Sequence, residues 1–225
     1  MITLRILYLI NYAGKAGTEK YVENLVRIFS AAGNECHFAY NIAGKLSEKM
    51  AARGVPCLQL DLAGSPTAAA KVLAAYCREH KIEVIHAQYP RENIIALLSL
   101  RHYAAPRVVY TNHLTIRSGL KWRVLNRIFT PRDHRIIAVC REGRDIMIQN
   151  GVCPERIEVI YNGVEPEKYP VRDMSVRPEL GIGEGEFMLS ILARYAPEKG
   201  LFFLLDALSE LKKLTDRPCL LYTSP

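Results

Sequence analysis

The sequence predicts an α/β fold in which helices cover both faces of a doubly wound parallel sheet. Short apolar runs alternate with stretches of helical apolar spacing from the N-terminus to about residue 160. The first run, residues 4–10, is apolar at every position except Arg5, as is typical of a parallel strand buried on both faces. The repeated order strand, helix, strand favours right-handed crossovers within one sheet, which is a Rossmann-like arrangement.

Length and composition exclude several other classes. The chain has 225 residues, of which 49% are hydrophobic and 24% charged, so it is not a disordered chain. No apolar run approaches the ~18 residues that a membrane span needs. Residues 1–10 lead directly into a glycine loop without a small-residue cleavage site, so we interpret them as a first strand and not a signal peptide. We therefore expect a cytoplasmic protein.

The remaining elements follow from capping signals and apolar spacing. Apolar residues at helical spacing predict a helix over 18–32, which Gly33 ends. Ser65 and Pro66 are an N-cap and first-position pair, and they open a helix that ends near residue 80. Further strands are predicted at 36–40, 55–60, 84–87, 107–111, 135–139 and 157–160. Further helices are predicted at 46–53, 91–102, 120–129 and 141–149.

The strands before residue 160 complete one domain, which we place at residues 1–168. Residues 169–186 contain several Pro and Gly and are predicted to be a linker. A new strand (187–193), a helix (199–214) and an apolar run (220–222) follow it. These elements cannot bury both faces of a sheet, so 187–225 is predicted to be the truncated start of a second α/β domain. A short extension packed on the first domain is the alternative.

The positive charge is concentrated in one segment. The formal net charge is +7, and residues 101–144 hold 10 Lys and Arg against 2 Asp and Glu. Within it, the predicted helix 120–129 carries Lys121, Arg123 and Arg127 among apolar residues, so these three are candidates for facing an anionic membrane. The alternative is a helix packed on its own domain with its charge in solvent. No RRM, KH or zinc-finger signature is present, so we expect no nucleic-acid partner.

Three segments carry motif-like patterns, and the first is a glycine loop. Residues 14–19 (GKAGTE) directly follow the first strand. Such a loop brings backbone N–H groups close to an anionic ligand at the positive end of a helix. Its spacing differs from GxGxxG, and no Gly-Lys-Ser/Thr follows, so a dinucleotide fingerprint and a Walker A loop are poorly supported. The other two segments are 159–164 (VIYNGV) and 192–200 (LARYAPEKG).

Together these segments resemble the GT-B glycosyltransferases, specifically the large retaining family 4. Residues 14–19 resemble the family's GGxE loop. Residues 159–164 resemble its vIpNGvD segment, with Tyr161 and Glu165 in place of the usual Pro and Asp. Residues 192–200 resemble GRLxPEKG, with Ala193 in place of the first Gly. The resemblance extends from about residue 4 to about residue 214. It implies a GT-B N-terminal domain on the acceptor side, followed by the start of a nucleotide-sugar-binding domain.

The resemblance implies a hexosyltransferase-type enzyme. It would transfer a sugar from a nucleotide-diphosphate-sugar donor to a hydroxyl acceptor with retention, in cell-envelope or polysaccharide glycan synthesis. Arg194 and Lys199 follow the first strand of the second domain, where arginine and lysine can bind phosphate oxygens. Together with Gly14 and Gly17 they are expected to bind the donor diphosphate. Cations there would stabilise the charge that grows on the leaving group.

Further candidates lie at or near the carboxyl ends of strands. His113 resembles the family's TxH histidine near the reacting sugar and the acceptor, and is the catalytic candidate. His86, Arg91 and Asn162 are expected on the acceptor side. A histidine can hydrogen-bond a sugar hydroxyl or a phosphate in either tautomer. Neither histidine need act as a base, because in a retaining transfer of this kind the leaving phosphate can take the acceptor proton.

No cofactor or metal is expected, because the nucleotide-sugar is a substrate. The acceptor would be a sugar, a lipid-linked acceptor or a polyol. The family's donor-side E-x7-E motif has no place in this chain, so the chain alone is expected to be inactive. Two alternatives stay open: a non-catalytic acceptor- or membrane-binding α/β domain, and a nucleotide-dependent oxidoreductase or epimerase. The expected location is cytoplasmic, or peripheral on the inner face of the plasma membrane.

Overall fold

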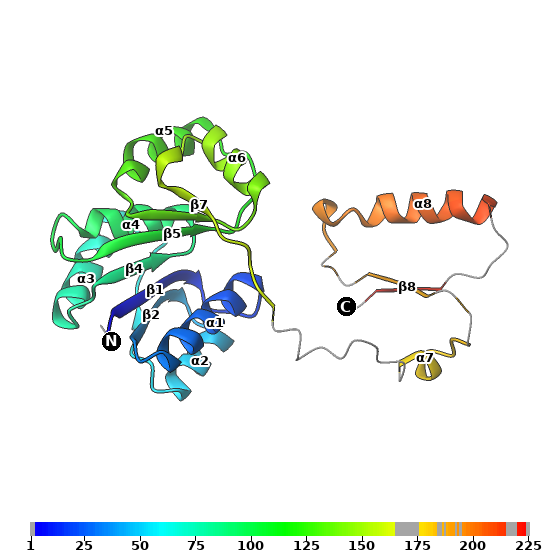
Figure 1. Cartoon of the computed structure of the whole chain (residues 1–225), viewed down its shortest axis with the longest axis horizontal. Coiled ribbons are helices and arrows are strands. Elements are labelled where there is room, and N and C mark those ends of the chain that lie inside the picture. Colours follow the sequence, from blue (N-terminus) through cyan, green and yellow to red (C-terminus); the bar gives the residue numbers. More distant parts are fainter. Residues whose placement is uncertain are drawn as a thin grey trace. The chain divides into compact units, whose positions relative to one another are not determined.

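The structure is a computed structural model, and it describes residues 3–164, 176–183, 186, 188–191, 193, 195–214 and 220–223. The chain divides into two compact units, Met1–Gly163 and Val164–Pro225, which are drawn in Figure 1. None of the described helices is long and apolar enough to cross a membrane.

The first unit contains a seven-stranded sheet in the order β3-β2-β1-β4-β5-β6-β7. Every pairing in it is parallel, which confirms the predicted doubly wound parallel sheet. The strand order reverses between β1 and β4, and ligands of open α/β sheets bind at such a switch point. The strands are β1 (Arg5–Tyr12), β2 (Glu35–Ile42), β3 (Cys57–Gln59), β4 (Val84–Ala87), β5 (Arg107–Asn112), β6 (Arg135–Ala138) and β7 (Ile157–Val159).

Helices cover both faces of this sheet (Figure 1). They are α1 (Gly17–Ala31), α2 (Lys45–Ala52), α3 (Pro66–Glu79), α4 (Pro90–Ser99), α5 (Leu120–Phe129) and α6 (Arg141–Gln149). Alternate residues of β1 enter two separate cores, as the period of a strand requires. Leu7 and Leu9 pack with residues of α3 and α4, whereas Tyr8 and Ile10 pack with residues of α1 and α2.

The predicted boundaries differ from the observed ones at a few ends. The helix predicted over 91–102 ends at Ser99 in the structure. Beyond it, the amides of Arg101 and His102 bond to carbonyls three residues back, and the Ser99 hydroxyl donates to the Ala96 carbonyl at 2.7 Å. A hydroxyl that bonds the backbone in this way competes with helical pairing, which gives a physical reason for the earlier end.

A buried carboxylate joins α1 to α2. Oε2 of Glu23 lies 3.4 Å from Nζ of Lys20 on α1 and 3.2 Å from Nζ of Lys49 on α2. Its Oε1 lies 3.0 Å from the guanidinium of Arg53, which directly follows α2. Burial alone would raise the pKa of Glu23. The neighbouring ammonium groups of Lys49 and Lys20 together outweigh burial, so its pKa lies below the ordinary value. The carboxylate therefore stays ionised while it holds the two helices together.

The second unit contains one βαβ element. Strands β8 (Met188–Ile191) and β9 (Leu220–Thr223) pair in parallel, and α8 (Leu201–Leu214) lies between them in the sequence. A short helix, α7 (Val176–Glu179), falls inside the predicted linker. Pro178 is compatible with so short a helix, because first-turn residues need no intrahelical N–H bond. Arg194 lies outside the described residues.

Candidate functional site

The carboxyl ends of β4 and β5 bring two histidines together with residues of α1. We call this group the histidine cluster; it consists of Thr18, Tyr21, His86, Gln88, Tyr89, Thr111 and His113. It lies beside the switch point of the sheet, the position at which ligands of open α/β sheets bind.

His113 is held in one tautomer by Gln88. Its Nε2 lies 3.0 Å from Oε1 of Gln88, and the Gln88 amide nitrogen donates to the carbonyl of His86 at 3.1 Å. Nε2 of His113 therefore carries the proton, and Nδ1 keeps its lone pair. Burial lowers the pKa of His113 to about 4, so the ring is neutral at neutral pH. Among the described residues, none bonds Nδ1, so the neutral ring can accept a hydrogen bond from a hydroxyl there.

His86 is more deeply buried than His113 and lies on the core side of the cluster. It is buried, and its Nε2 is hydrogen-bonded to Oγ1 of Thr111 at 2.7 Å. Burial, with a smaller contribution from the neighbouring His113, lowers the pKa of His86 to about 3. The ring centroid lies 5.6 Å from that of Tyr8, inside the core. Nε2 of His86 is therefore already bonded within the protein.

Helix α1 supplies Thr18 and Tyr21, and Tyr89 is the N-cap residue of α4. Oγ1 of Thr18 lies 2.8 Å from Oη of Tyr89, and the Tyr21 ring meets His113 edge-on with 5.0 Å between centroids. Sequence reasoning missed Thr18, Tyr21, Gln88 and Tyr89. The available signals were that Gln88 and Tyr89 directly follow a predicted strand, and that Thr18 and Tyr21 lie three residues apart and so share a helix face.

The glycine loop lies at the N-terminus of α1. Neither Gly14 nor Gly17 has a left-handed backbone. A Cβ on Gly14 would lie 2.2 Å from the Tyr12 ring, so that glycine permits a close approach. A Cβ on Gly17 would meet nothing within 4 Å. The N-cap residue Ala16 provides no side-chain cap, so the amides of the first turn remain available to a ligand.

A basic cavity of about 450 Å³ opens beside this loop. We call it the lysine pocket; it is lined by Gly14, Lys15, Ala16, Glu19, Lys20, Glu23, Lys45, Leu46 and Lys49. Within the described part of the chain, Lys15 and Lys45 form no ion pair. Two lysines without a carboxylate partner and an uncapped helix N-terminus favour an anionic ligand there.

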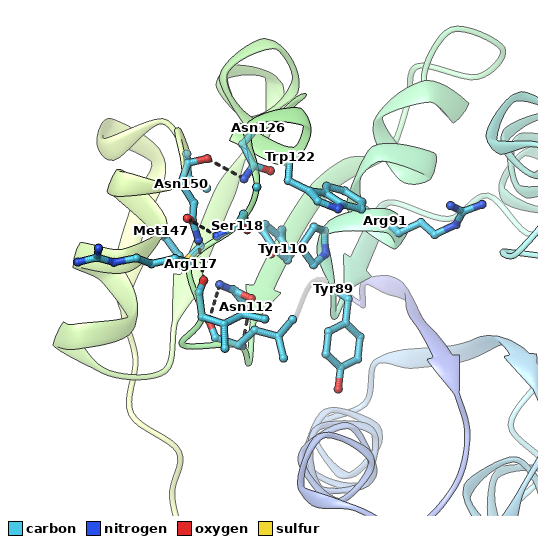
Figure 2. Close-up of a pocket in the computed structure, with 15 residues that line it drawn as sticks. Tyr89, Arg91, Tyr110, Asn112, Arg117, Ser118, Trp122, Asn126, Met147 and Asn150 are labelled. Carbon is cyan, nitrogen blue, oxygen red and sulfur yellow. Dashed lines mark hydrogen bonds between the residues drawn. The ribbon is translucent and has the colours of Figure 1, made fainter. Parts of the chain in front are cut away.

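A second cavity, of about 370 Å³, adjoins the histidine cluster and is shown in Figure 2. We call it the aromatic pocket. Its lining residues are Tyr89, Pro90, Arg91, Tyr110, Asn112, Leu114, Ile116, Arg117, Ser118, Gly119, Trp122, Asn126, Met147, Asn150 and Val152. Tyr89 belongs both to this pocket and to the histidine cluster, so the two are contiguous.

Two buried carboxyl groups lie on or against α4. Asp133 accepts a hydrogen bond from the Asn93 amide at 2.9 Å, and Glu92 lies in the first turn of α4. Oδ1 of Asp133 and Oε1 of Glu92 have no partner among the described residues. Burial raises the pKa of Glu92 to about 7 and that of Asp133 to about 8. Both groups therefore hold protons well above the ordinary carboxyl range.

Other candidates from the sequence lie apart from the cluster. The Arg91 guanidinium donates to the carbonyls of Leu62, Ala63 and Gly64, and in Figure 2 it points away from the aromatic pocket. It therefore fixes the loop before α3. Asn162 is exposed after β7. Lys199 ends a short 3₁₀ helix, Pro197–Lys199, and is exposed.

Helix α5 exposes an apolar stripe next to its basic residues. Asn126 is its one buried residue, whereas Leu120, Val124 and Ile128 are 75%, 49% and 52% exposed. These three lie four residues apart and so share one helix face. Lys121, Arg123 and Arg127 are exposed on the same helix.

No group of three or more His, Cys, Asp or Glu side chains is placed to hold a metal ion in the part of the chain that the structure describes.

Comparisons with known proteins agree with this architecture. Among solved structures, Anabaena Alr3699/HepE in complex with UDP-glucose matches with a TM-score of 0.79 at 18% identity, over 98% of this chain and 60% of that chain. A glycosyltransferase from Rickettsia africae ESF-5 matches with a TM-score of 0.77 at 16% identity, over 97% and 60%. Sucrose-phosphate synthase from Thermosynechococcus elongatus matches with a TM-score of 0.71 at 13% identity, over 98% and 62%.

These likenesses show the fold, which is that of the GT-B glycosyltransferases. The chain spans about 60% of the length of the first two of these structures. No curated protein matches the chain. The sequence profile of Glycosyltransferase Family 4 matches residues 16–168, which is more than half of the chain. The chain therefore belongs to glycosyltransferase family 4.

Proposed function

We propose that this protein is part of a glycosyltransferase that transfers a hexose from a nucleotide-diphosphate-sugar donor to a hydroxyl acceptor with retention. The family assignment supports the reaction class. The observation that carries the proposal is the neutral His113, which lies at the switch point of the sheet with a free Nδ1. Synthesis of a cell-envelope or polysaccharide glycan is the role we propose for the product.

In the proposed step, the bond between the anomeric carbon and the diphosphate oxygen breaks. A new bond to the acceptor oxygen forms on the same face of the sugar, and the acceptor proton passes to the leaving phosphate. His113 would accept a hydrogen bond from a sugar hydroxyl through Nδ1 and would thereby orient the sugar. A group with a pKa of about 4 is a weak base, which supports a role in positioning over one in proton abstraction.

The diphosphate would be bound by backbone amides and cations. The first unit would contribute the backbone amides of the uncapped first turn of α1 at Gly17. It would also contribute the ammonium groups of Lys15 and Lys45, which line the lysine pocket. Arg194 and Lys199 would bind the diphosphate from the second unit. Positive groups aimed at the leaving diphosphate stabilise the charge that develops in the transition state. We expect no metal requirement, because the nucleotide-sugar is a substrate and these side chains supply the cations.

Calorimetric titration tests the proposal against the two alternatives. A protein that consists of this chain with a whole second domain is titrated with UDP-glucose, GDP-mannose, ADP-glucose and NAD. Binding of a nucleotide sugar, weakened at least ~10-fold in Gly17→Ala, supports the proposal. The Cβ added at Gly17 meets no neighbour within 4 Å and alanine favours a helix more than glycine does, so the unfolding midpoint should not fall. Binding of NAD alone would favour an oxidoreductase, and binding of none would favour a non-catalytic domain.

We further propose that α5 docks the protein on an anionic membrane surface. The exposed stripe of Leu120, Val124 and Ile128 beside three basic residues supports this second role. A helix with one apolar face and one basic face can lie in the interface of an anionic bilayer. The protein would then be peripheral on the inner face of the plasma membrane, with its active site near lipid-linked acceptors.

A further inference from the structure

Most side-chain amide groups in the wall of the aromatic pocket are already bonded within the protein. Oδ1 of Asn150 accepts from the Ser118 amide at 2.8 Å, and its Nδ2 donates to the Ile116 carbonyl at 2.9 Å. Nδ2 of Asn126 donates to the Asn150 carbonyl at 2.9 Å. Asn112 bonds both the amide and the carbonyl of Leu114. These amides hold the loop between β5 and α5 in place, and they leave little hydrogen-bonding capacity for a ligand.

The charged ends of the two lining arginines leave the pocket. In Figure 2 the guanidinium groups of Arg91 and Arg117 extend outward on opposite sides of it. Long basic side chains often bury an apolar stem and keep the charge outside. The surface that remains for a ligand comes from Tyr89, Leu114, Trp122 and their apolar neighbours. The interior of the pocket is therefore mainly apolar and aromatic.

The pocket adjoins the histidine cluster. The ring centroid of Tyr89 lies 6.0 Å from that of His113, and Asn112 and Leu114 flank His113 in the sequence. The Tyr89 hydroxyl points away from the pocket in Figure 2 and bonds Thr18, so the ring itself forms the wall. A ligand that fills the pocket therefore has one end against Tyr89, whose ring neighbours that of His113.

We propose that the aromatic pocket binds the apolar body of the acceptor. The acceptor is then an alcohol or sugar that carries an alkyl or aromatic group, and its reacting hydroxyl reaches His113. A free sugar or polyol would leave its hydroxyls unpaired against this wall, which is unfavourable. The volume of about 370 Å³ is near the lower end of the ~300–1,000 Å³ usual for ligand pockets, so it suits one ring system or a short chain. This inference rests on the proposed sugar transfer.

Trp122 provides a direct test, because it is the one tryptophan of the chain and lines the pocket. The 225-residue protein is titrated with octyl β-D-glucopyranoside, below its micelle concentration, and with methyl β-D-glucopyranoside. The two probes share the sugar and differ in the chain. The octyl probe should change the Trp122 fluorescence and bind at least ~100-fold more tightly than the methyl probe. Equal responses to the two probes would overturn the inference.

Three variants show where on the protein the octyl probe binds. Leu114→Asp places a charge in the pocket wall and should weaken octyl-probe binding by at least ~10-fold. Val72→Asp is the matched control, because Val72 is also exposed but lies on α3 outside the pocket. Val124→Asp alters the exposed stripe of α5 and should leave binding unchanged. If Val124→Asp abolishes the response and Leu114→Asp does not, the probe binds the helix surface and the inference is wrong.

A failure of the acceptor assignment can be distinguished from a failure of the proposed sugar transfer. Binding of the octyl probe by the wild type, with no transfer to it in a protein that carries a whole second domain, would count against the reaction alone. Transfer to methyl and octyl glucosides with equal KM would overturn the acceptor assignment and leave the reaction standing.

Discussion

Gln88 forms a hydrogen bond with His113 and thereby determines which ring nitrogen of His113 carries the proton. The Gln88 nitrogen donates to the His86 carbonyl, so its oxygen is the group that faces Nε2 of His113 at 3.0 Å. The proton is thereby fixed on Nε2. Because Gln88 is uncharged, nothing in this contact offsets the burial that lowers the pKa of His113.

Gln88→Glu should raise the pKa of His113. A carboxylate 3 Å from the ring favours its charged form and should shift the value up from about 4 by about one to three pH units. The measurement is an NMR titration of the histidine ring signals in the wild type and the variant. Gln59→Glu on β3 is the matched control and should leave the His113 titration unchanged. An unchanged titration in Gln88→Glu would show that Gln88 does not face the ring.

His113→Gln should make stability less sensitive to acid. The unfolded chain protonates His113 near pH 6.5, whereas the folded chain does so only near pH 4. Between these values the unfolded state binds more protons, so this histidine lowers the free energy of unfolding as the pH falls, by up to ~1.4 kcal/mol per pH unit. Urea unfolding at pH 4.5 and 7 checks this. Exposed His102→Gln is the control, and equal pH dependence of both variants would contradict the prediction.

Asp133→Asn should have the opposite effect on the pH dependence of the free energy of unfolding. The folded-state pKa of Asp133, about 8, lies above the unfolded value near 3.8, so the folded state binds more protons between them. The stabilising contribution of this group is complete below pH 3.8 and is lost as the pH rises through 8. The variant should gain stability relative to the wild type between pH 5 and 8. Exposed Asp61→Asn should show no such gain, and a flat difference for Asp133→Asn would refute the assignment.

Reversal of Lys121, Arg123 and Arg127 to Glu should abolish binding to acidic vesicles. Each basic residue near an anionic surface contributes about 1 kcal/mol, so the triple reversal should weaken binding by more than ~100-fold. Salt should weaken it as well, since the screening length is ~10 Å at 0.1 M. Co-sedimentation with vesicles at two salt concentrations measures both effects. Reversal of Lys71, Lys81 and Arg141 is the control, and binding that ignores salt and the first reversal would exclude membrane docking.

Arg194→Ala or Lys199→Ala should reduce turnover by ~10²–10³-fold in a protein that carries a whole second domain. That is the usual range for the loss of one group that stabilises developing charge. Lys212→Ala on α8 is the matched surface control. The unfolding of the first unit should be unaffected by Lys199→Ala, because Lys199 belongs to the other unit. Wild-type turnover in both donor-side variants would remove their proposed role.

Most of the sheet was predictable because its signals are local. The continuous apolar run of β1 and the capping of α3 by Ser65 can be read from adjacent residues, and α5 and α6 have the predicted bounds. The candidate site was less accessible. His113 was identified through its motif, but its partner Gln88 lies 25 residues away in the sequence.

The aromatic pocket also depends on contacts between residues that lie far apart in the sequence. Asn150 holds Ile116 from a distance of 34 residues, and no local pattern marks an asparagine at a helix C-terminus as a brace for a distant loop. Arg91 illustrates the converse. Its place at the start of α4 suggested a ligand contact, but three carbonyls of a loop that precedes it by 27 to 29 residues take up its donors. Such pairings depend on the assembled fold and could not be derived from spacing.

The contacts of Glu23 imply redundancy between α1 and α2. Three cations surround one carboxylate, so the loss of Lys20, Lys49 or Arg53 leaves two others in place. Glu23 has no such substitute, because its removal would leave several basic groups close together without an anion. Genetic variation should therefore be tolerated at each cation separately and be tightly restricted at the carboxylate, although all four residues share one interaction.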